Sequence, residues 1–111
     1  EGDRPITGFE VIDLPGHTPG QIGLLIGEGA DRMLHIADLA HHHVLSFAHP
    51  EWSILSDAQP ALAVATRQRV FARAAAERLR LFGAHLPFPA LGHARAVGDR
   101  YEYVIEPWVT L

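Results

Sequence analysis

The stretch Leu14-Pro-Gly-His-Thr-Pro-Gly20 is the most informative part of the sequence. It follows residues 6–13 (ITGFEVID), whose β-branched and apolar residues predict a strand, and it precedes residues 21–26 (QIGLLI), which predict a second strand. Because Pro fixes φ and Gly permits positive φ, the stretch between the two strands is a stiff loop of defined shape rather than a regular element. That loop presents one histidine, His17, directly after a strand.

The remaining pattern predicts one α+β domain over residues 1–111. A long helix is expected to begin at Asp57, a good N-cap, and to continue to about residue 80. Residues 39–56 are expected to form a loop with a short helical turn. The other strands are expected at 33–36, 81–84, 94–97 and 101–105, the last two forming a hairpin. Together these elements predict a mostly antiparallel or mixed sheet of about six strands with the helix on one face.

Composition and charge exclude several classes of function. The net charge of -4 argues against nucleic acid as the main partner. All nine basic residues are Arg, which excludes a Lys Schiff base and a phosphate-loop lysine, and the absence of Cys excludes thiol catalysis and disulfides. No apolar run reaches the ~18–20 residues of a membrane span. We expect a soluble protein, either cytoplasmic or exported.

Three residues of the metal-binding type each lie just after a predicted strand: His17, Asp38 and His85. If these strands belong to one sheet, the three side chains converge at one edge. Imidazole nitrogen and carboxylate oxygen suit Zn²⁺, and a carboxylate can bridge two ions. Each residue alone also has an ordinary structural explanation as a turn or cap, so the metal hypothesis depends on all three.

The other histidines give weaker signals. His41, His42 and His43 are consecutive, and adjacent side chains of an extended segment point to opposite sides, so all three cannot easily bind one ion. A supporting role for one of them, donating to a ligand carboxylate, is favoured. His93 lies in a Pro- and Gly-rich stretch, where it either lines the mouth of a site or caps a turn.

Two arginines fall on the apolar face of the predicted helix. Arg67 and Arg78 either extend their guanidinium groups to the edge of that face, or one is buried and paired. In the second case Asp57 is the nearest partner for Arg67.

In combination, these motifs resemble a known family. The His17 loop, then Ile36-Ala-Asp38, then Ala84-His85-Leu-Pro-Phe-Pro-Ala-Leu-Gly-His93 are similar in order and spacing to the C-terminal half of a metallo-β-lactamase-fold hydrolase. The most similar subgroup contains methyl parathion hydrolase and lactonase-like enzymes. The resemblance covers about Ile6 to Trp108, with further matches at Pro50-Glu-Trp52, Asp57, Ala65-Thr-Arg67 and Gly98-Asp-Arg-Tyr101.

The resemblance implies an αβ/βα sandwich with a two-metal site at one edge of the sheets. It implies that His17 binds the first ion, that Asp38 is the catalytic residue bridging both ions, and that His85 binds the second. A bridging water or hydroxide would be the nucleophile. The divalent ions are expected to be Zn, with Mn, Fe or Co as alternatives. Supporting or rim positions are expected at His41, His42, His93 and Arg67.

Two departures from the family pattern matter. Asp38 follows Ala37, where the family usually has Gly. The His-x-His-x-Asp-His motif, which supplies most ligands from the family's N-terminal half, is absent. Each ion would then keep only two protein ligands, His17 with Asp38 and Asp38 with His85, whereas a catalytic zinc normally has three. We therefore expect incomplete or no metal binding, and no activity, in this chain alone.

The expected parent is a metal-dependent hydrolase acting on a small molecule with an ester-like bond: a lactone, ester, β-lactam or phosphotriester. The alternative is a non-catalytic, self-associating fragment or interaction module with the same half-fold. Without a partner sheet, one apolar sheet face would stay open, which predicts a homodimer or pairing with the missing N-terminal half.

Overall fold

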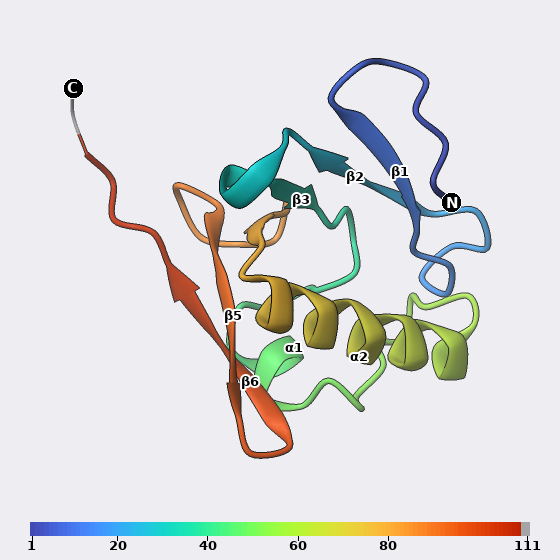
Figure 1. The fold of residues 1–111 in the computed structure, drawn as a ribbon. Coiled ribbons are helices and arrows are strands. Elements are labelled where there is room, and N and C mark those ends of the chain that lie inside the picture. Colours follow the sequence, from blue (N-terminus) through green and yellow to red (C-terminus); the bar gives the residue numbers. More distant parts are fainter. Residues whose placement is uncertain (110–111) are drawn as a thin grey trace.

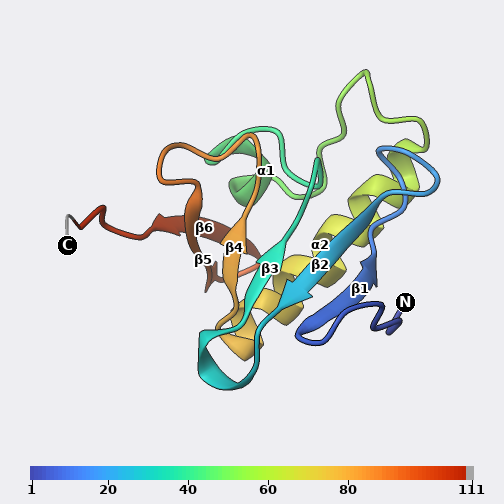
Figure 2. The same ribbon diagram turned by 90° about the horizontal axis from the view of Figure 1, so that it is seen from above.

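The computed structural model describes residues 1–109. Six strands form one sheet in the order β1-β2-β3-β4-β5-β6, and a long helix, α2, packs on one face of it (Figures 1 and 2). All neighbouring strands are antiparallel except β3 and β4, which are parallel, so the expected mixed sheet of about six strands with one long helix is confirmed. The strands are β1 Phe9–Asp13, β2 Ile22–Ile26, β3 Met33–His35, β4 Arg80–Phe82, β5 Leu91–Val97 and β6 Arg100–Ile105.

The helices lie in the connections between strands. A 3₁₀ turn, η1 (Gly29–Asp31), joins β2 to β3, while α1 (Leu45–Ala48) and α2 (Pro60–Glu77) lie between β3 and β4. Parallel strands need a long crossover, and the segment with α1 and α2 provides it. No helix in residues 1–109 is both long and apolar enough to cross a membrane.

Helix α2 is shorter than the sequence predicted. It begins at Pro60 with Gln59 as its N-cap residue, so Asp57 lies before the helix and is not its cap. It ends at Glu77 because Arg78 adopts a left-handed conformation with φ of 53°, and its N–H bonds to the Ala74 carbonyl. The side chain of Arg78 is exposed, as expected for an arginine that reaches the helix edge.

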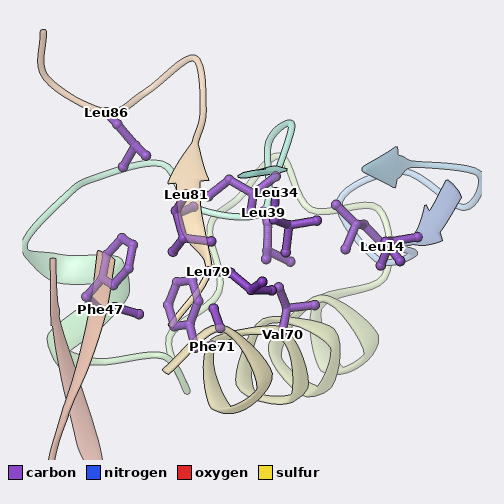
Figure 3. Close-up of a cluster of buried hydrophobic side chains, with 14 of the residues drawn as sticks. Leu14, Leu34, Leu39, Phe47, Val70, Phe71, Leu79, Leu81 and Leu86 are labelled. Carbon is purple, nitrogen blue, oxygen red and sulfur yellow. The ribbon is translucent and has the colours of Figure 1, made fainter. Parts of the chain in front are cut away.

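The hydrophobic core lies between the sheet and the two helices (Figure 3). Phe47 of α1 stacks on Phe71 of α2 with ring centroids 4.3 Å apart, which joins the helices to each other. The fully buried side chains of this cluster include Ile12, Leu14, Leu34, Ile36, Phe47, Val70, Phe71, Leu79 and Leu81. Because Leu14 and Ile36 lie just before the loops that carry His17 and Asp38, the core anchors both loops.

The sheet face opposite α2 is open in residues 1–109. A row of cross-strand neighbours on this face is only partly buried or exposed: Val11, Leu24, His35, Phe82 and Leu91. Phe82, near the middle of the row, is 38% exposed. The open apolar face expected from the sequence is therefore present, and apolar faces of this kind often form interfaces.

Candidate metal centre

Three loops meet at one edge of the sheet. Strands β1, β3 and β4 run in the same direction, because β1 and β3 are each antiparallel to β2, and β4 is parallel to β3. Their C-terminal ends therefore lie at the same edge. His17 follows β1, Asp38 follows β3 and His85 follows β4, so the topology brings the three predicted ligands together.

The carboxylate of Asp38 lies between the two imidazoles. His85 Nε2 is 2.9 Å from Asp38 Oδ1, and His17 Nε2 is 3.7 Å from Asp38 Oδ2. Each oxygen of Asp38 thus faces a different histidine, which is the arrangement expected of a bridging carboxylate. The predicted convergence of these three side chains is confirmed.

The donor set fits divalent metal ions. Two ligand atoms that each lie about 2.0–2.2 Å from one zinc ion are roughly 3.3–3.6 Å apart at tetrahedral angles. The two N···O separations, 2.9 and 3.7 Å, lie on either side of this range. Imidazole nitrogen and carboxylate oxygen are also the ligand types that zinc accepts. If His17, Asp38 and His85 are ligands of two ions, they offer two donors to each, fewer than the three of a catalytic zinc.

Asp57 orients His17. Its Oδ1 lies 3.0 Å from His17 Nδ1, and its Oδ2 accepts a hydrogen bond from the Ile54 N–H at 3.1 Å. Burial raises the pKa of Asp57, but these two hydrogen bonds and the charge of Arg67 outweigh burial and hold that pKa below its usual value. An ionised Asp57 can only accept, so His17 carries its proton on Nδ1 and directs the Nε2 lone pair towards Asp38.

The sequence alone does not predict this role of Asp57. It predicts Asp57 at the start of the helix, with Arg67 as its nearest partner. No local signal could have shown the contact, because Asp57 and His17 are 40 residues apart in the sequence.

His41 lies beside both His17 and His85. Its ring centroid is 4.7 Å from that of His17 and 5.2 Å from that of His85. Both ring nitrogens are buried, and neither has a hydrogen-bond partner within residues 1–109. Burial, followed by the nearby charge of His17, lowers the pKa of His41, which favours a neutral imidazole. This side chain offers a free donor and a free acceptor beside the predicted ligands.

A second combination of donors also has metal-like spacing. The ligand atoms of His17, His41 and Asp57 lie within 4.8 Å of one another. Both oxygens of Asp57, however, already accept hydrogen bonds. Asp57 is therefore better suited to orienting His17 than to binding an ion itself, and we favour Asp38 as the carboxylate ligand.

The remaining predicted rim residues have their contacts elsewhere. His42 Nδ1 accepts hydrogen bonds from the N–H groups of Val44 and Leu45 at 3.1 and 3.2 Å, which caps the start of α1. His93 lies on β5, where its Nδ1 is 3.9 Å from Glu106.

Arg67 is buried, so of the two alternatives left open by the sequence the paired one is correct. Only 2% of its surface is exposed, and its NH2 lies 3.9 Å from Asp57 Oδ2. Its Nε donates to the Leu39 carbonyl at 2.8 Å, one residue beyond Asp38. Burial lowers the pKa of Arg67, and the charge of Asp57 opposes that shift.

The residue before Asp38 has a strained backbone. Ala37 has φ of 46°, in the left-handed region that glycine adopts without steric cost. This conformation gives a physical reason for the glycine that the family usually has at this position.

Comparison with known proteins agrees with the family resemblance of the sequence. No protein-family model matches the sequence, and no curated protein matches it. Among solved structures, a hydrolase of the beta lactamase superfamily, AbOPH, matches with a TM-score of 0.89 and 33% identity over 95% of this chain. AidC, described as a dizinc quorum-quenching lactonase, matches with a TM-score of 0.91 and 30% identity over 99% of this chain. The chain belongs to the metallo-β-lactamase superfamily.

The chain corresponds to only part of its metallo-β-lactamase relatives. It spans 36% of the AbOPH chain and 38% of the AidC chain. A quorum-quenching N-acyl homoserine lactone lactonase shares the fold at 22% identity, with a TM-score of 0.61, over 80% of this chain and 40% of its own. The structure is thus a partial metallo-β-lactamase fold.

Proposed function

We propose that this chain supplies the C-terminal share of a two-metal hydrolase site. His17 would bind one ion, His85 the other, and Asp38 both. The observation that carries the proposal is the position of Asp38, whose two oxygens face two different imidazoles. The dizinc description of AidC supports zinc as the metal, with Mn, Fe and Co as alternatives.

The residues of the chain would hold and shape the reacting region. Asp57 keeps the His17 ring in one orientation, and Asp38 contributes a negative charge that balances two cations. His41 places a neutral imidazole beside both His17 and His85, with its ring nitrogens buried. When bound, the metal ions would lower the pKa of water towards about 7 and stabilise negative charge on the substrate.

The proposed substrate is a small molecule with an ester-like bond. A lactone is favoured first, because AidC is described as a lactonase. A carboxylic ester, a β-lactam and a phosphotriester remain in the same chemical class, since each develops negative charge on an oxygen when attacked.

A second candidate function is that of a non-catalytic, self-associating module. The open sheet face favours it, as does the shortage of ligands for each ion within residues 1–109. Metal stoichiometry separates the two candidates. A hydrolase half that regains its other ligands should hold two ions, whereas a module that only associates should hold none at this edge.

The test is a Co²⁺ titration followed by visible absorption, first with the 111-residue chain and then with the chain mixed with or fused to a segment carrying His-x-His-x-Asp-His. The fusion should bind two ions, and His17→Ala, Asp38→Asn and His85→Ala should each reduce that number or weaken binding. His93→Ala, on β5 beside Glu106, is the control and should leave binding unchanged. If none of the three ligand variants alters Co²⁺ binding, the proposal is wrong.

A further inference from the structure

The largest fully buried side chain of the core is a charged one, Arg67. Its guanidinium donates to three backbone carbonyls: Nε to Leu39 at 2.8 Å, and NH1 to Pro50 at 3.1 Å and to Trp52 at 2.5 Å. All three carbonyls belong to the segment 39–52, which begins directly after Asp38. The planar fork of an arginine suits this task, because it offers five donors in fixed directions.

The third nitrogen of the guanidinium, NH2, faces Asp57. Arg67 NH2 lies 3.9 Å from Asp57 Oδ2, and Asp57 Oδ1 in turn contacts His17. Arg67 therefore connects to both sides of the candidate centre. One route runs through the Leu39 carbonyl to the backbone that carries Asp38, and the other runs through Asp57 to the imidazole of His17.

The first two turns of α2 carry a second connection to the His17 loop. Thr66 Oγ1 donates to the Pro15 carbonyl at 2.7 Å. At Gly16 a Cβ would lie 2.3 Å from Ala63 Cα, so the loop rests directly on the helix. The two views of the ribbon agree that this loop lies beside the start of α2 (Figures 1 and 2). Helix α2 thus contacts both loops. Arg67 donates to the loop that follows Asp38, and it faces Asp57, which contacts His17 of the other loop.

Packing alone does not explain why the charged side chain of Arg67 lies in the core. Burying a guanidinium is costly unless hydrogen bonds and a counter-charge compensate it. Both are present here, and both lead to residues adjacent to the predicted ligands. The arrangement therefore links Arg67 to the surroundings of both Asp38 and His17, a link that filled volume alone would not provide.

We propose that Arg67 is a positioning residue of the metal centre. It holds Asp57 where that carboxylate fixes the Nδ1–H form of the His17 ring, and it holds the backbone after Asp38 through the Leu39 carbonyl. This inference rests on the proposed function of His17 and Asp38 as ligands, but its first readout, the protonation pattern of His17, does not require a metal.

The experiment uses the ¹⁵N-labelled chain at about pH 8, where imidazoles are neutral. Long-range ¹H–¹⁵N correlation spectra report which ring nitrogen of His17 carries the proton, and a Co²⁺ titration reports affinity. In the unmodified chain we expect the Nδ1–H form. In Arg67→Met we expect a shift towards the Nε2–H form and a Co²⁺ affinity lower by about 10–100-fold, the usual effect of losing an outer-shell partner. Arg67→Lys should restore part of the Nδ1–H population of His17 and part of the Co²⁺ affinity.

The matched control is Val70→Ala, a buried position of α2 one turn after Arg67. It should lower stability while leaving the His17 ring form unchanged, which separates positioning from a general loss of stability. Should Arg67→Met not fold, Arg67→Lys and Arg67→Gln carry the test. Folded Arg67 variants with the His17 form and the Co²⁺ affinity of the unmodified chain would overturn the inference. The proposed function fails if Co²⁺ binds neither to the 111-residue chain nor to its fusion with a segment carrying His-x-His-x-Asp-His. In that case the His17 ring form alone decides the role of Arg67.

Discussion

His17 Nδ1 lies 3.0 Å from Asp57 Oδ1, across 40 residues of sequence. The Asp57 side chain is completely buried, whereas that of His17 is 17% exposed. The contact thus joins a fixed internal carboxylate to an imidazole that reaches the edge of the sheet. A histidine ligand held in this way keeps one ring nitrogen free for a metal ion.

Replacement of Asp57 is expected to affect both stability and metal affinity. Asp57→Ala would leave the buried charge of Arg67 without its carboxylate, which costs roughly 3–5 kcal/mol for pairs of this kind. It would also free the His17 ring and lower Co²⁺ affinity about 10–100-fold. Urea denaturation and a Co²⁺ titration measure the two effects. Asp99→Ala, in the exposed turn between β5 and β6, is the control, and an Asp57→Ala chain as stable as that control would contradict the account.

The succession of strands and the long helix along the chain could be predicted from the sequence, because both depend on local patterns. The same holds for the position of three site residues, each just after a strand. Alternating and β-branched residues mark the strands, and His17, Asp38 and His85 each follow one of them. The roles of Asp57 and Arg67 depend on contacts between distant segments. The sequence could suggest that Arg67 is either buried or exposed, but only the fold shows which carbonyls it reaches.

The boundaries of α2 illustrate the same limit. Asp57 is a favourable N-cap residue, so local propensity placed the helix start there. In the structure both of its oxygens are used by Ile54 and His17, and the helix begins three residues later at Pro60. Tertiary hydrogen bonds took precedence over the local capping preference.

Ala37 offers a prediction on backbone strain. Its φ of 46° is unfavourable for a residue with a Cβ, so Ala37→Gly should stabilise the chain by about 1 kcal/mol. The control is Ala76→Gly on the exposed side of α2, where glycine should instead destabilise by about 1 kcal/mol. Thermal and urea unfolding of the two variants should therefore change in opposite directions. A loss of stability in Ala37→Gly would show that this backbone is not strained.

The ion pair of Arg80 and Glu106 predicts a pH dependence. Two hydrogen bonds from Arg80, at 2.8 and 2.9 Å, lower the pKa of Glu106 below its ordinary value of 4.5, and partial burial opposes them. A carboxyl whose pKa is lowered by folding stabilises the chain above its ordinary pKa, and this contribution is lost as pH falls through the lowered value. The pair is partly exposed, so the effect should be roughly 1 kcal/mol or less.

The measurement compares the unmodified chain with Glu106→Gln by urea denaturation over a range of pH. The difference in free energy of unfolding between the unmodified chain and Glu106→Gln should be largest above pH 4.5. It should become smaller as the pH falls below that value. Glu28→Gln, an exposed position for which residues 1–109 show no ion pair, is the control for general charge effects. A difference that grows towards acidic pH would have the wrong sign and would contradict the role of this pair.

The open sheet face predicts self-association of the isolated chain. Light scattering at micromolar concentration should show a dimer or larger species rather than a monomer of 12.2 kDa. Phe82→Lys should shift the population towards the monomer, because it places a charge in the row formed by Val11, Leu24, His35 and Leu91. The control is Leu62→Lys on α2, since Leu62 is 39% exposed and Phe82 is 38% exposed. Equal effects of the two variants would argue against this face as the interface.

The last prediction concerns catalysis. The 111-residue chain alone should not hydrolyse lactones, esters or phosphotriesters, even with added Zn²⁺ or Mn²⁺, because His17, Asp38 and His85 leave each ion one protein ligand short. A chain in which this segment is joined to one carrying His-x-His-x-Asp-His should be active, and Asp38→Asn should remove most of its turnover, since an amide cannot balance the charge of two cations. His41→Ala should cost less, because His41 is beside the ligands rather than between the ions. A substrate panel assayed on all four proteins tests these expectations together. Turnover by the 111-residue chain near that of the joined chain would show that the ligands of the other segment are dispensable. The account of each ion as one protein ligand short would then be wrong.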